Sequence, residues 1–260
     1  KNIKISKELN KQGYSSSLPI LTKDGKEYPD GKEIFILTRG IKGNPLPRAK
    51  KFGDDRIRFG EKYGISIARL HQALKAIQKD ISPDEVNLFK NITEWALPSI
   101  RRQNIQWTMG IDESFFDDYI ETFGKLYEKL PKQLIHRDPN PSNILFDGDE
   151  VSGFIDFDLS EINIRLWDVC YCATGILSEG TDEAYEKWLD ILGGILRGYD
   201  LEAKMTKEEK QAVFYVICSI QMICIAYFES IENLKELAKI NRQMFVYIIQ
   251  NKSNIMNLFK

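Results

Sequence analysis

The most informative segment of the sequence is Leu134-Ile-His136-Arg137-Asp138-Pro-Asn-Pro-Ser-Asn143-Ile-Leu-Phe146. A short apolar run is followed directly by His-Arg-Asp, and an Asn follows the Asp by five residues. A second apolar segment, Gly153-Phe-Ile155-Asp156-Phe-Asp158, carries two acids. Short apolar runs bounded by Pro, Asn and Gly predict strands joined by tight loops. The acids and the Asn should therefore lie in loops at strand ends, where a rigid scaffold commonly holds functional groups.

These residue types are the ones that phosphoryl transfer requires. A carboxylate accepts the proton of the attacking hydroxyl, and an Asn and a second Asp hold Mg²⁺ on the nucleotide phosphates. Asp138 and Asn143 would face one site from opposite ends of a turn, and the following strand pair would bring Asp156 beside them. Three oxygen donors suit a hard cation such as Mg²⁺, with water and phosphate completing its coordination. The pattern therefore favours kinase-type chemistry.

Three other interpretations explain less of this stretch. A turn rich in Asp and Asn with capping roles does not explain why three polar residues follow apolar strands at this spacing. A D-x-D metal motif at Asp156 and Asp158, as in sugar-nucleotide transferases, gives the His-Arg-Asp loop no purpose. A glycosidase pair of Asp138 and Asp156 leaves Asn143 unused.

At these residues the sequence resembles the superfamily of aminoglycoside phosphotransferases, choline kinases and type II homoserine kinases, from about Leu18 to at least Leu177. The resemblance implies an α+β, bilobal, protein-kinase-like fold with a small β-containing N-terminal lobe and a large, mainly helical C-terminal lobe. It also implies ATP and Mg²⁺ as cofactors and a small-molecule hydroxyl as the phosphate acceptor.

The resemblance also assigns roles to individual residues. Asp138 corresponds to the catalytic base, and Asn143 and Asp156 to the Mg²⁺ ligands. His136 corresponds to a structural residue bonded to backbone, and Asp168 to a buried residue that supports the catalytic loop. The ATP-binding positions are Thr38, Arg39, Gly40 and Ile41 beside the adenine, with Leu145 and Ile155 beneath its ring. His71, in Ala68-Arg-Leu-His71, is expected to pack rather than react.

A protein kinase is the nearest alternative, because it shares the His-Arg-Asp letters. It usually has Lys two residues after the catalytic Asp, where this chain has Asn140. It also needs a long activation segment ending in Ala-Pro-Glu, yet only eleven residues separate Asp156 from Asp168 and no such tripeptide occurs. A small acceptor is therefore favoured over a protein.

Outside this segment the sequence predicts helix and strand in the N-terminal 40 residues and mostly helix in the rest of the chain. We assign residues 1–40 to a remnant of the nucleotide-binding lobe and 41–260 to the helical lobe that holds the catalytic loop and metal site. The expected helices are Lys1–Gln12, Phe59–Gln78, one beginning at Ser82, Asp112–Leu130, Arg165–Leu177, Asp182–Tyr199, Lys207–Phe228 and Asn233–Gln250. The expected strands are Leu18–Lys23, Glu33–Thr38, Leu134–His136, Ile144–Phe146 and Val151–Phe157, with turns at Asp24-Gly25 and Pro29-Asp30-Gly31.

The front of the chain departs from the family pattern. Family members begin with a Gly-rich strand-turn-strand, a strand Lys and a helix Glu, and nothing before Lys23 supplies them. We expect a preceding piece of about 70 to 90 residues, judged from what a five-stranded small lobe needs. The alternative is a non-catalytic, nucleotide-binding or scaffold member of the same fold.

Composition narrows the remaining function classes. The 260 residues are 43% hydrophobic and 28% charged, which is typical of a folded domain. A formal charge of −2 argues against a nucleic-acid partner. The most apolar run, Ala212–Phe228, contains Ser219 and Gln221 and is shorter than the roughly 20 residues of a membrane span, so it predicts a core helix and no membrane partner. The four cysteines are too few for a disulfide framework in a chain of this length, which favours the reducing cytoplasm. The chain has only two histidines, so a zinc site is improbable.

The acceptor stays open at this level: an aminoglycoside, an amino alcohol, a homoserine-like amino acid or a sugar. Acids near the catalytic segments would either contact a polycation or simply line solvated helix faces; they are Glu161, Glu179, Asp182, Glu183 and Glu186. Aromatic residues would either box a quaternary amine or pack in the core; they are Trp167, Tyr171 and Tyr227. The oligomeric state is not predicted.

Overall fold

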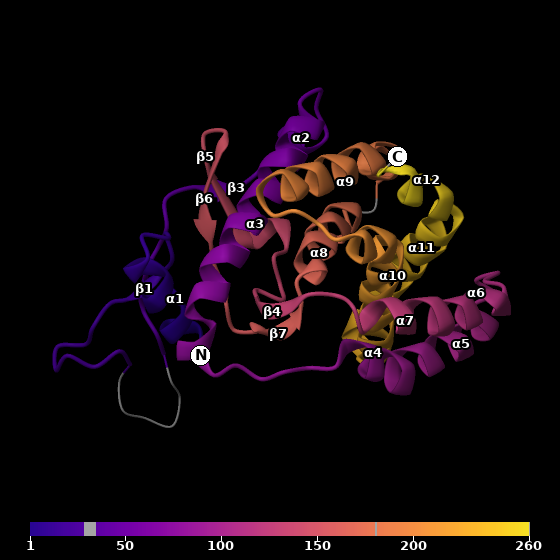
Figure 1. The fold of residues 1–260 in the computed structure, drawn as a ribbon, viewed down its shortest axis with the longest axis horizontal. Helices are drawn as coiled ribbons and strands as arrows, with labels where there is room; N and C mark the ends of the chain where they lie inside the picture. The colour runs from indigo at the N-terminus through magenta and orange to yellow at the C-terminus, as the bar shows by residue number, and fades with distance from the viewer. Residues whose placement is uncertain (29–34, 180, 260) are drawn as a thin grey trace.

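The computed structural model describes residues 1–28, 35–179 and 181–259, and it combines a helical body with three small β-sheets (Figure 1). It is 63% helical. The helices of the first half are α1 (Asn2–Lys11), α2 (Arg48–Lys51), α3 (Arg56–Ile81), α4 (Leu88–Asn91), α5 (Leu97–Gln106), α6 (Glu113–Asp118) and α7 (Gly124–Tyr127), with π-helical turns at Ile92–Ala96 and Tyr119–Phe123. Those of the second half are α8 (Leu166–Leu177), α9 (Asp182–Glu202), α10 (Lys207–Glu229), α11 (Lys235–Gln250) and α12 (Lys252–Asn257), with 3₁₀ turns at Pro141–Asn143 and Glu232–Leu234.

The strands are short and form separate sheets. Antiparallel β1 (Leu18–Pro19) and β2 (Thr38–Arg39) make a ribbon. In the second sheet β5 (Ile144–Asp147) lies between β3 (Asn44–Pro45) and β6 (Glu150–Phe154). The third pairs β4 (Lys132–Ile135) with β7 (Glu161–Ile164). The predicted strand 134–136 therefore exists but pairs with β7, an element the sequence did not indicate, rather than with β5 or β6.

The N-terminal prediction is confirmed for the helix and corrected for the strands. α1 buries Ile5 and Leu9, and Gly13 follows it with φ of +77°, the left-handed conformation that commonly ends helices. The predicted strand 18–23 is reduced to β1. The second begins only at Thr38, and the part of the prediction on residues 29–34 lies outside the described residues. Apolar side chains beside the ribbon stay exposed, among them Leu21 and Leu37.

The predicted helix start at Ser82 is wrong. Ser82 instead ends α3 in the left-handed conformation, with φ of +50°, because a residue that precedes proline is disfavoured in a helix. The segment that follows lies parallel to β7: Ile162 N donates to Asp84 O at 2.8 Å, and Val86 N donates to Ile162 O at 3.2 Å. The next helix begins at Leu88, where the Asn87 side chain accepts from Lys90 N.

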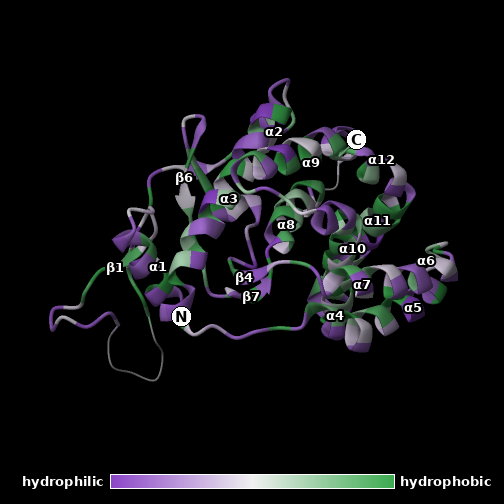
Figure 2. Cartoon of the chain, in the orientation of Figure 1, coloured by the Kyte–Doolittle hydropathy of each residue, from purple (hydrophilic) through white to green (hydrophobic). Residues whose placement is uncertain are grey.

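The core lies between the long helices, whose hydrophobic and hydrophilic residues alternate along the chain in Figure 2. α10 is the one helix in the described residues with the length and hydropathy of a membrane span, and 72% of its most apolar window is buried in the fold. The prediction of a core helix over 212–228 is confirmed by that burial. Thr206 and Glu209 form a capping box that begins α10, and Arg165 binds Glu209 at 2.7 Å.

Glycines allow α3 and α9 to pack with their backbones in close approach. A Cβ atom on Gly60 would lie 2.8 Å from Ile191 O, and one on Gly194 would lie 2.6 Å from Ile57 O. Each helix has another glycine in close contact with the other helix four residues later, at Gly64 and Gly198. This contact fixes α3, which carries His71, against the helix that carries Tyr199.

Replacing Gly194 by Ala should therefore lower the free energy of unfolding by about 1–3 kcal/mol, the usual cost of overpacking a tight contact. The matched control is Gly193→Ala on the same helix. Its added Cβ meets only the flexible ends of Arg197 and Leu258, at 3.3 and 3.4 Å, so the better helix propensity of Ala should leave stability equal or higher. Urea unfolding of both variants measures the difference, and equal stabilities would contradict the close-approach argument.

Candidate active site

The loop between β4 and β5 holds Asp138 and Asn143 together. The Asn140 side chain accepts a hydrogen bond from Ser142 N at 3.1 Å and so caps the turn Pro141–Asn143. Asn143 Nδ2 then donates to Asp138 O at 3.0 Å and to Asp138 Oδ2 at 3.1 Å. The Asn143 amide thereby fixes the orientation of the half-buried Asp138 carboxylate.

The β5–β6 hairpin brings Asp156 to the same place. Ile144, directly after Asn143, pairs with Phe154, and Ile155 N donates to Asn143 O at 3.0 Å. Asp156 follows in a left-handed conformation, with φ of +66°, and its side chain is exposed. The three residues predicted from the sequence as base and metal ligands are thus gathered at one end of this hairpin.

His136 is fully buried beneath the loop. Its Nε2 donates to Ile155 O at 3.0 Å, its Nδ1 accepts from Asp138 N at 3.3 Å, and its ring lies 4.6 Å from that of Phe157. Burial lowers the pKa of His136, which favours the neutral imidazole that this donor–acceptor pattern requires. His136 therefore links the Asp138 and Asp156 segments through backbone groups.

Asp168 lies at the first turn of α8 and is completely buried. Its carboxylate accepts from His136 N at 2.8 Å, from Arg137 N at 2.9 Å and from His71 Nε2 at 2.9 Å. His71 Nδ1 in turn accepts from the Tyr199 hydroxyl at 2.8 Å. Arg137 has φ of +76°, a conformation that costs free energy in a residue with a Cβ. Asp168 holds that strained residue in place directly before Asp138.

A stack of side chains supports the loop from α8, and sequence reasoning did not find it. Arg137 lies 3.5 Å above the Trp167 ring and pairs with Glu161 at 2.8 Å, and Trp167 Nε1 donates to Arg137 O at 2.9 Å. Tyr171 stacks on Trp167, and its hydroxyl lowers the pKa of the nearby Asp138 carboxyl. The available signal was spacing: Tyr171 follows Asp168 by three residues and so lies on the same helix face.

The pKa of the Asp138 carboxyl is raised above its ordinary value by burial, and the Tyr171 hydroxyl opposes that rise. A base works when deprotonated, so if Asp138 is the predicted base, turnover should fall as the pH drops through this raised pKa. Tyr171→Phe removes the opposing hydroxyl and should move the acid limb of the kcat/KM profile to higher pH. The control is Tyr185→Phe, because Tyr185 belongs to α9 and its ring packs against Tyr247. An unshifted profile in Tyr171→Phe would contradict the role of the Tyr171 hydroxyl.

A cavity of about 550 Å³ adjoins Asp156. Five of the six residues predicted to bind ATP line it, together with residues of α1: Thr38, Gly40, Ile41, Leu145 and Ile155 with Asn2, Ile3 and Ser6. Arg39 does not line it, because neighbouring residues of a strand point to opposite sides. Asp156, Phe157 and Asp158 close one end. The volume falls in the range of small-molecule sites.

The residues beside this cavity fit a divalent cation held partly by phosphate. Asn143 uses its Nδ2 on Asp138, which leaves Oδ1 as the donor for a cation, and the exposed Asp156 and Asp158 offer carboxylates. No group of three or more His, Cys, Asp or Glu within the described residues could hold a metal by itself. Mg²⁺ commonly takes one or two protein oxygens and fills its other positions with phosphate and water, so the donor set suits it.

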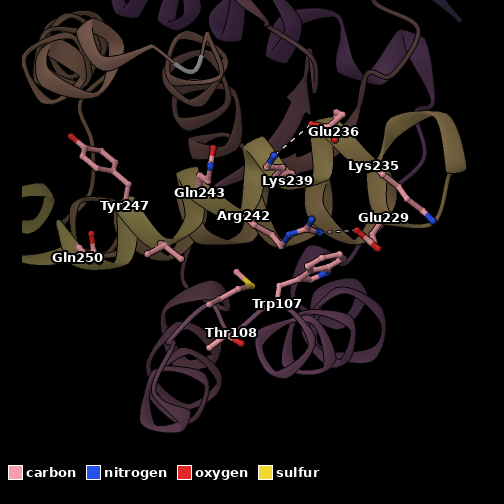
Figure 3. A pocket seen from close by; sticks show the side chains of 12 residues that line it. Trp107, Thr108, Glu229, Lys235, Glu236, Lys239, Arg242, Gln243, Tyr247 and Gln250 are labelled. Carbon is pink, nitrogen blue, oxygen red and sulfur yellow. Dashed lines mark hydrogen bonds and ion pairs between the residues drawn. The ribbon is translucent and has the colours of Figure 1, made fainter.

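A larger cavity, of about 790 Å³, lies elsewhere. It is a groove between α11 and the turn after α5, where Arg242 lies over Trp107 and pairs with Glu229 (Figure 3). None of the predicted site residues lines it. This groove is therefore not part of the candidate active site.

Comparison with known proteins bears on the fold and the family of this chain. The homoserine kinase of Zymomonas mobilis is 29% identical over 100 residues, which are 38% of this chain and 30% of that protein. The chain thus spans less than a third of the length of that relative. An aminoglycoside phosphotransferase from Alicyclobacillus acidocaldarius superimposes with a TM-score of 0.62 at 15% identity, over 96% of this chain and 81% of that one.

A choline/ethanolamine kinase family protein from Mesorhizobium loti gives a TM-score of 0.58 at 16% identity, over 99% and 81%. These likenesses confirm the predicted protein-kinase-like fold class. The family model described as the phosphotransferase enzyme family matches residues 3–203. The resemblance expected from the catalytic loop is confirmed, and the chain belongs to the phosphotransferase enzyme family.

Proposed function

We propose that the protein transfers the γ-phosphoryl group of ATP, with Mg²⁺, to a hydroxyl of a small molecule. The observation that carries the proposal is the meeting of Asp138, Asn143 and Asp156 at one hairpin end, beside a cavity lined by the residues predicted to bind ATP. The similar proteins include kinases of homoserine and a choline/ethanolamine kinase family protein. The substrates of these proteins support a small acceptor but do not identify one.

In this proposal the acceptor hydroxyl oxygen attacks the γ-phosphorus, the bond from that phosphorus to the β–γ bridging oxygen breaks, and ADP leaves. Asp138 accepts the hydroxyl proton at its carboxylate. The bond from Asn143 keeps the carboxylate in one orientation, and the Tyr171 hydroxyl favours its ionised form by opposing the rise in its pKa. Mg²⁺, held by Asn143 Oδ1 and Asp156, would neutralise the phosphate charges.

We further assign residues 1–40 to the nucleotide-binding lobe and 41–260 to the lobe that holds the acceptor. α1 and the β1–β2 ribbon supply one wall of the 550 Å³ cavity, and the β5–β6 hairpin supplies the other. The four cysteines are free thiols, which suits a reducing compartment, and we propose the cytoplasm.

Asp156→Asn tests the proposal most directly. Asn tolerates the left-handed conformation and keeps the fold, but it removes a charge from the metal site. We expect the KM for Mg·ATP to rise about tenfold or more, which corresponds to roughly 1.4 kcal/mol of lost binding, and the thermal shift on adding Mg·ATP to shrink.

The control is Asp147→Asn, at the other end of β5, where the carboxylate pairs only on the surface with Lys42 at 2.8 Å. That variant should match the unmodified protein. If Asp156→Asn keeps both the thermal shift and the turnover, the metal assignment fails. If the unmodified protein binds Mg·ATP but transfers no phosphate to any hydroxyl, a nucleotide-binding scaffold replaces the enzyme.

A further inference from the structure

A second, smaller cavity lies against the catalytic loop, between α8, α10 and α11. Asn140 and Tyr171 form the wall next to Asp138: Asn140 lies two residues after it in the loop, and the Tyr171 hydroxyl lowers the pKa of its carboxyl. The volume is about 150 Å³. That equals roughly five water molecules at about 30 Å³ each, so the cavity suits a compound of three or four carbons.

The cavity wall is uncharged. Among the described residues that line it there is no Asp, Glu, Lys, Arg or His; its polar groups are amides, hydroxyls and a thiol, and the rest are apolar or glycine. A charged group would lose its hydration here without gaining a counter-charge from the wall, and the nearby Asp138 carboxylate is the proposed base rather than an ion-pair partner. The wall therefore disfavours a charged acceptor.

Two of the acids that could have recognised a cation form ion pairs elsewhere. Glu161 pairs with Arg137 at 2.8 Å, and Glu179 pairs with Arg48 at 2.5 Å and also with Lys51. None of the acids singled out in the sequence lines this cavity. Trp167 is buried beneath Arg137 and is likewise absent from the wall. Neither an acidic patch nor a complete aromatic box faces the cavity.

Gln221 is the one side chain of the wall with an unmet hydrogen bond in the described part of the protein. It lies in α10 at 1% exposure, and its Oε1 has no partner. A buried acceptor without a donor costs free energy of folding. A hydroxyl group entering the cavity would supply that donor, so Gln221 points to a ligand rather than to packing.

We propose that this cavity binds the acceptor and that the acceptor is a short, uncharged polyol. One hydroxyl donates to Gln221 Oε1, and another lies toward Asp138 and receives the phosphoryl group. The inference rests on the proposed function and names its substrate class. The larger groove in Figure 3 is a poor alternative, because Lys235, Lys239 and Glu236 charge its wall and none of its residues belongs to the catalytic loop.

The first experiment measures phosphate transfer from Mg·ATP by the full-length protein to alcohols of similar size. Glycerol and erythritol represent the polyols, ethanolamine and choline the cations, and homoserine the zwitterions. We expect kcat/KM for at least one polyol to exceed that for each charged alcohol by tenfold or more. Faster transfer to a charged alcohol overturns the inference and leaves the proposed function standing.

The second experiment uses Gln221 variants. Gln221→Leu removes the unpaired acceptor, so the KM for the polyol should rise tenfold or more while the thermal midpoint stays equal or increases. Gln221→Glu places a charge in the wall and should shift the preference toward ethanolamine. The matched control is Gln243→Leu, on an exposed position of α11 that lines the other groove, and it should match the unmodified protein.

The outcomes separate the two proposals. Polyol transfer with the same KM in Gln221→Leu means that the acceptor binds elsewhere, which overturns the inference. Folded protein that shows no thermal shift with Mg·ATP and no transfer to any of the alcohols overturns the proposed function itself. Polyol transfer that depends on Gln221 and switches with Gln221→Glu supports both.

Discussion

Replacing Asp138 by Asn is expected to lower kcat by about 10²- to 10⁴-fold, the range that loss of a general base produces. The amide cannot accept the hydroxyl proton, but it keeps the size of the carboxylate. Its oxygen can still accept from Asn143 Nδ2, as the carboxylate does at 3.1 Å. The KM for Mg·ATP should therefore change little, because nucleotide contacts come from the cavity beside Asp156.

The measurement is steady-state turnover with both substrates varied, together with the thermal shift on adding Mg·ATP. Asp158→Asn, in the loop between β6 and β7, is the control, because Asp158 lines the nucleotide cavity. Its effect should fall on the KM for Mg·ATP rather than on kcat. A raised nucleotide KM with normal kcat in Asp138→Asn would contradict the base role.

Sequence reasoning did well where one local signal matched the tertiary structure. The apolar spacing of the long helices and the loop residues of 134–158 predicted α3, α8, α9, α10 and the β5–β6 hairpin. The expectation that Asp156 lies beside Asn143 came from the residue types that phosphoryl transfer needs, and the hairpin does bring the two residues together. The fold class and the family are confirmed, while the roles of the individual site residues remain predictions.

The predictions fail where a contact with residues far away in the sequence determines the local structure. Ser82 carries the signal of a helix start, but Asp84 and Val86 find backbone partners on Ile162, and pairing with a distant strand outweighs a local preference. β7 was not predicted because it begins with the charged Glu161, which is unusual in a short strand. In the structure Arg137 pairs with Glu161 and neutralises its charge. The tertiary position of Arg137 could not be read from the chain.

The supporting residues were missed for a related reason. Tyr171 was interpreted as core or as part of an aromatic box, because its contact with Asp138 depends on how α8 lies against the loop. Gln221 reads as a polar interruption of an apolar helix, and only the structure shows that its oxygen is buried without a donor. Hydrogen-bond satisfaction is a three-dimensional property, so sequence periodicity does not report it.

Asp168→Asn is expected to destabilise the fold by about 3 kcal/mol or more. The carboxylate accepts three N–H donors, from His136 N, Arg137 N and His71 Nε2, at 2.8 to 2.9 Å. An amide offers one oxygen and one NH₂ group, so at least one buried donor would face another donor. Each orphaned buried group costs about 1–3 kcal/mol, and hydrogen bonds to a charged acceptor lie at the upper end. Urea unfolding measures the loss.

The same substitution on the surface provides the control. Asp149→Asn removes a partly exposed carboxylate that pairs with Lys50 at 2.5 Å and Arg58 at 3.0 Å, and surface pairs of this kind contribute about 0–1 kcal/mol. Asp168→Asn should also lower kcat at temperatures where it remains folded, because Arg137 loses the bond that holds its φ of +76° next to Asp138. Equal stability of the two variants would show that the loop is held by packing instead. A destabilised variant with unchanged kcat would separate the role of Asp168 in the fold from any role in positioning the base.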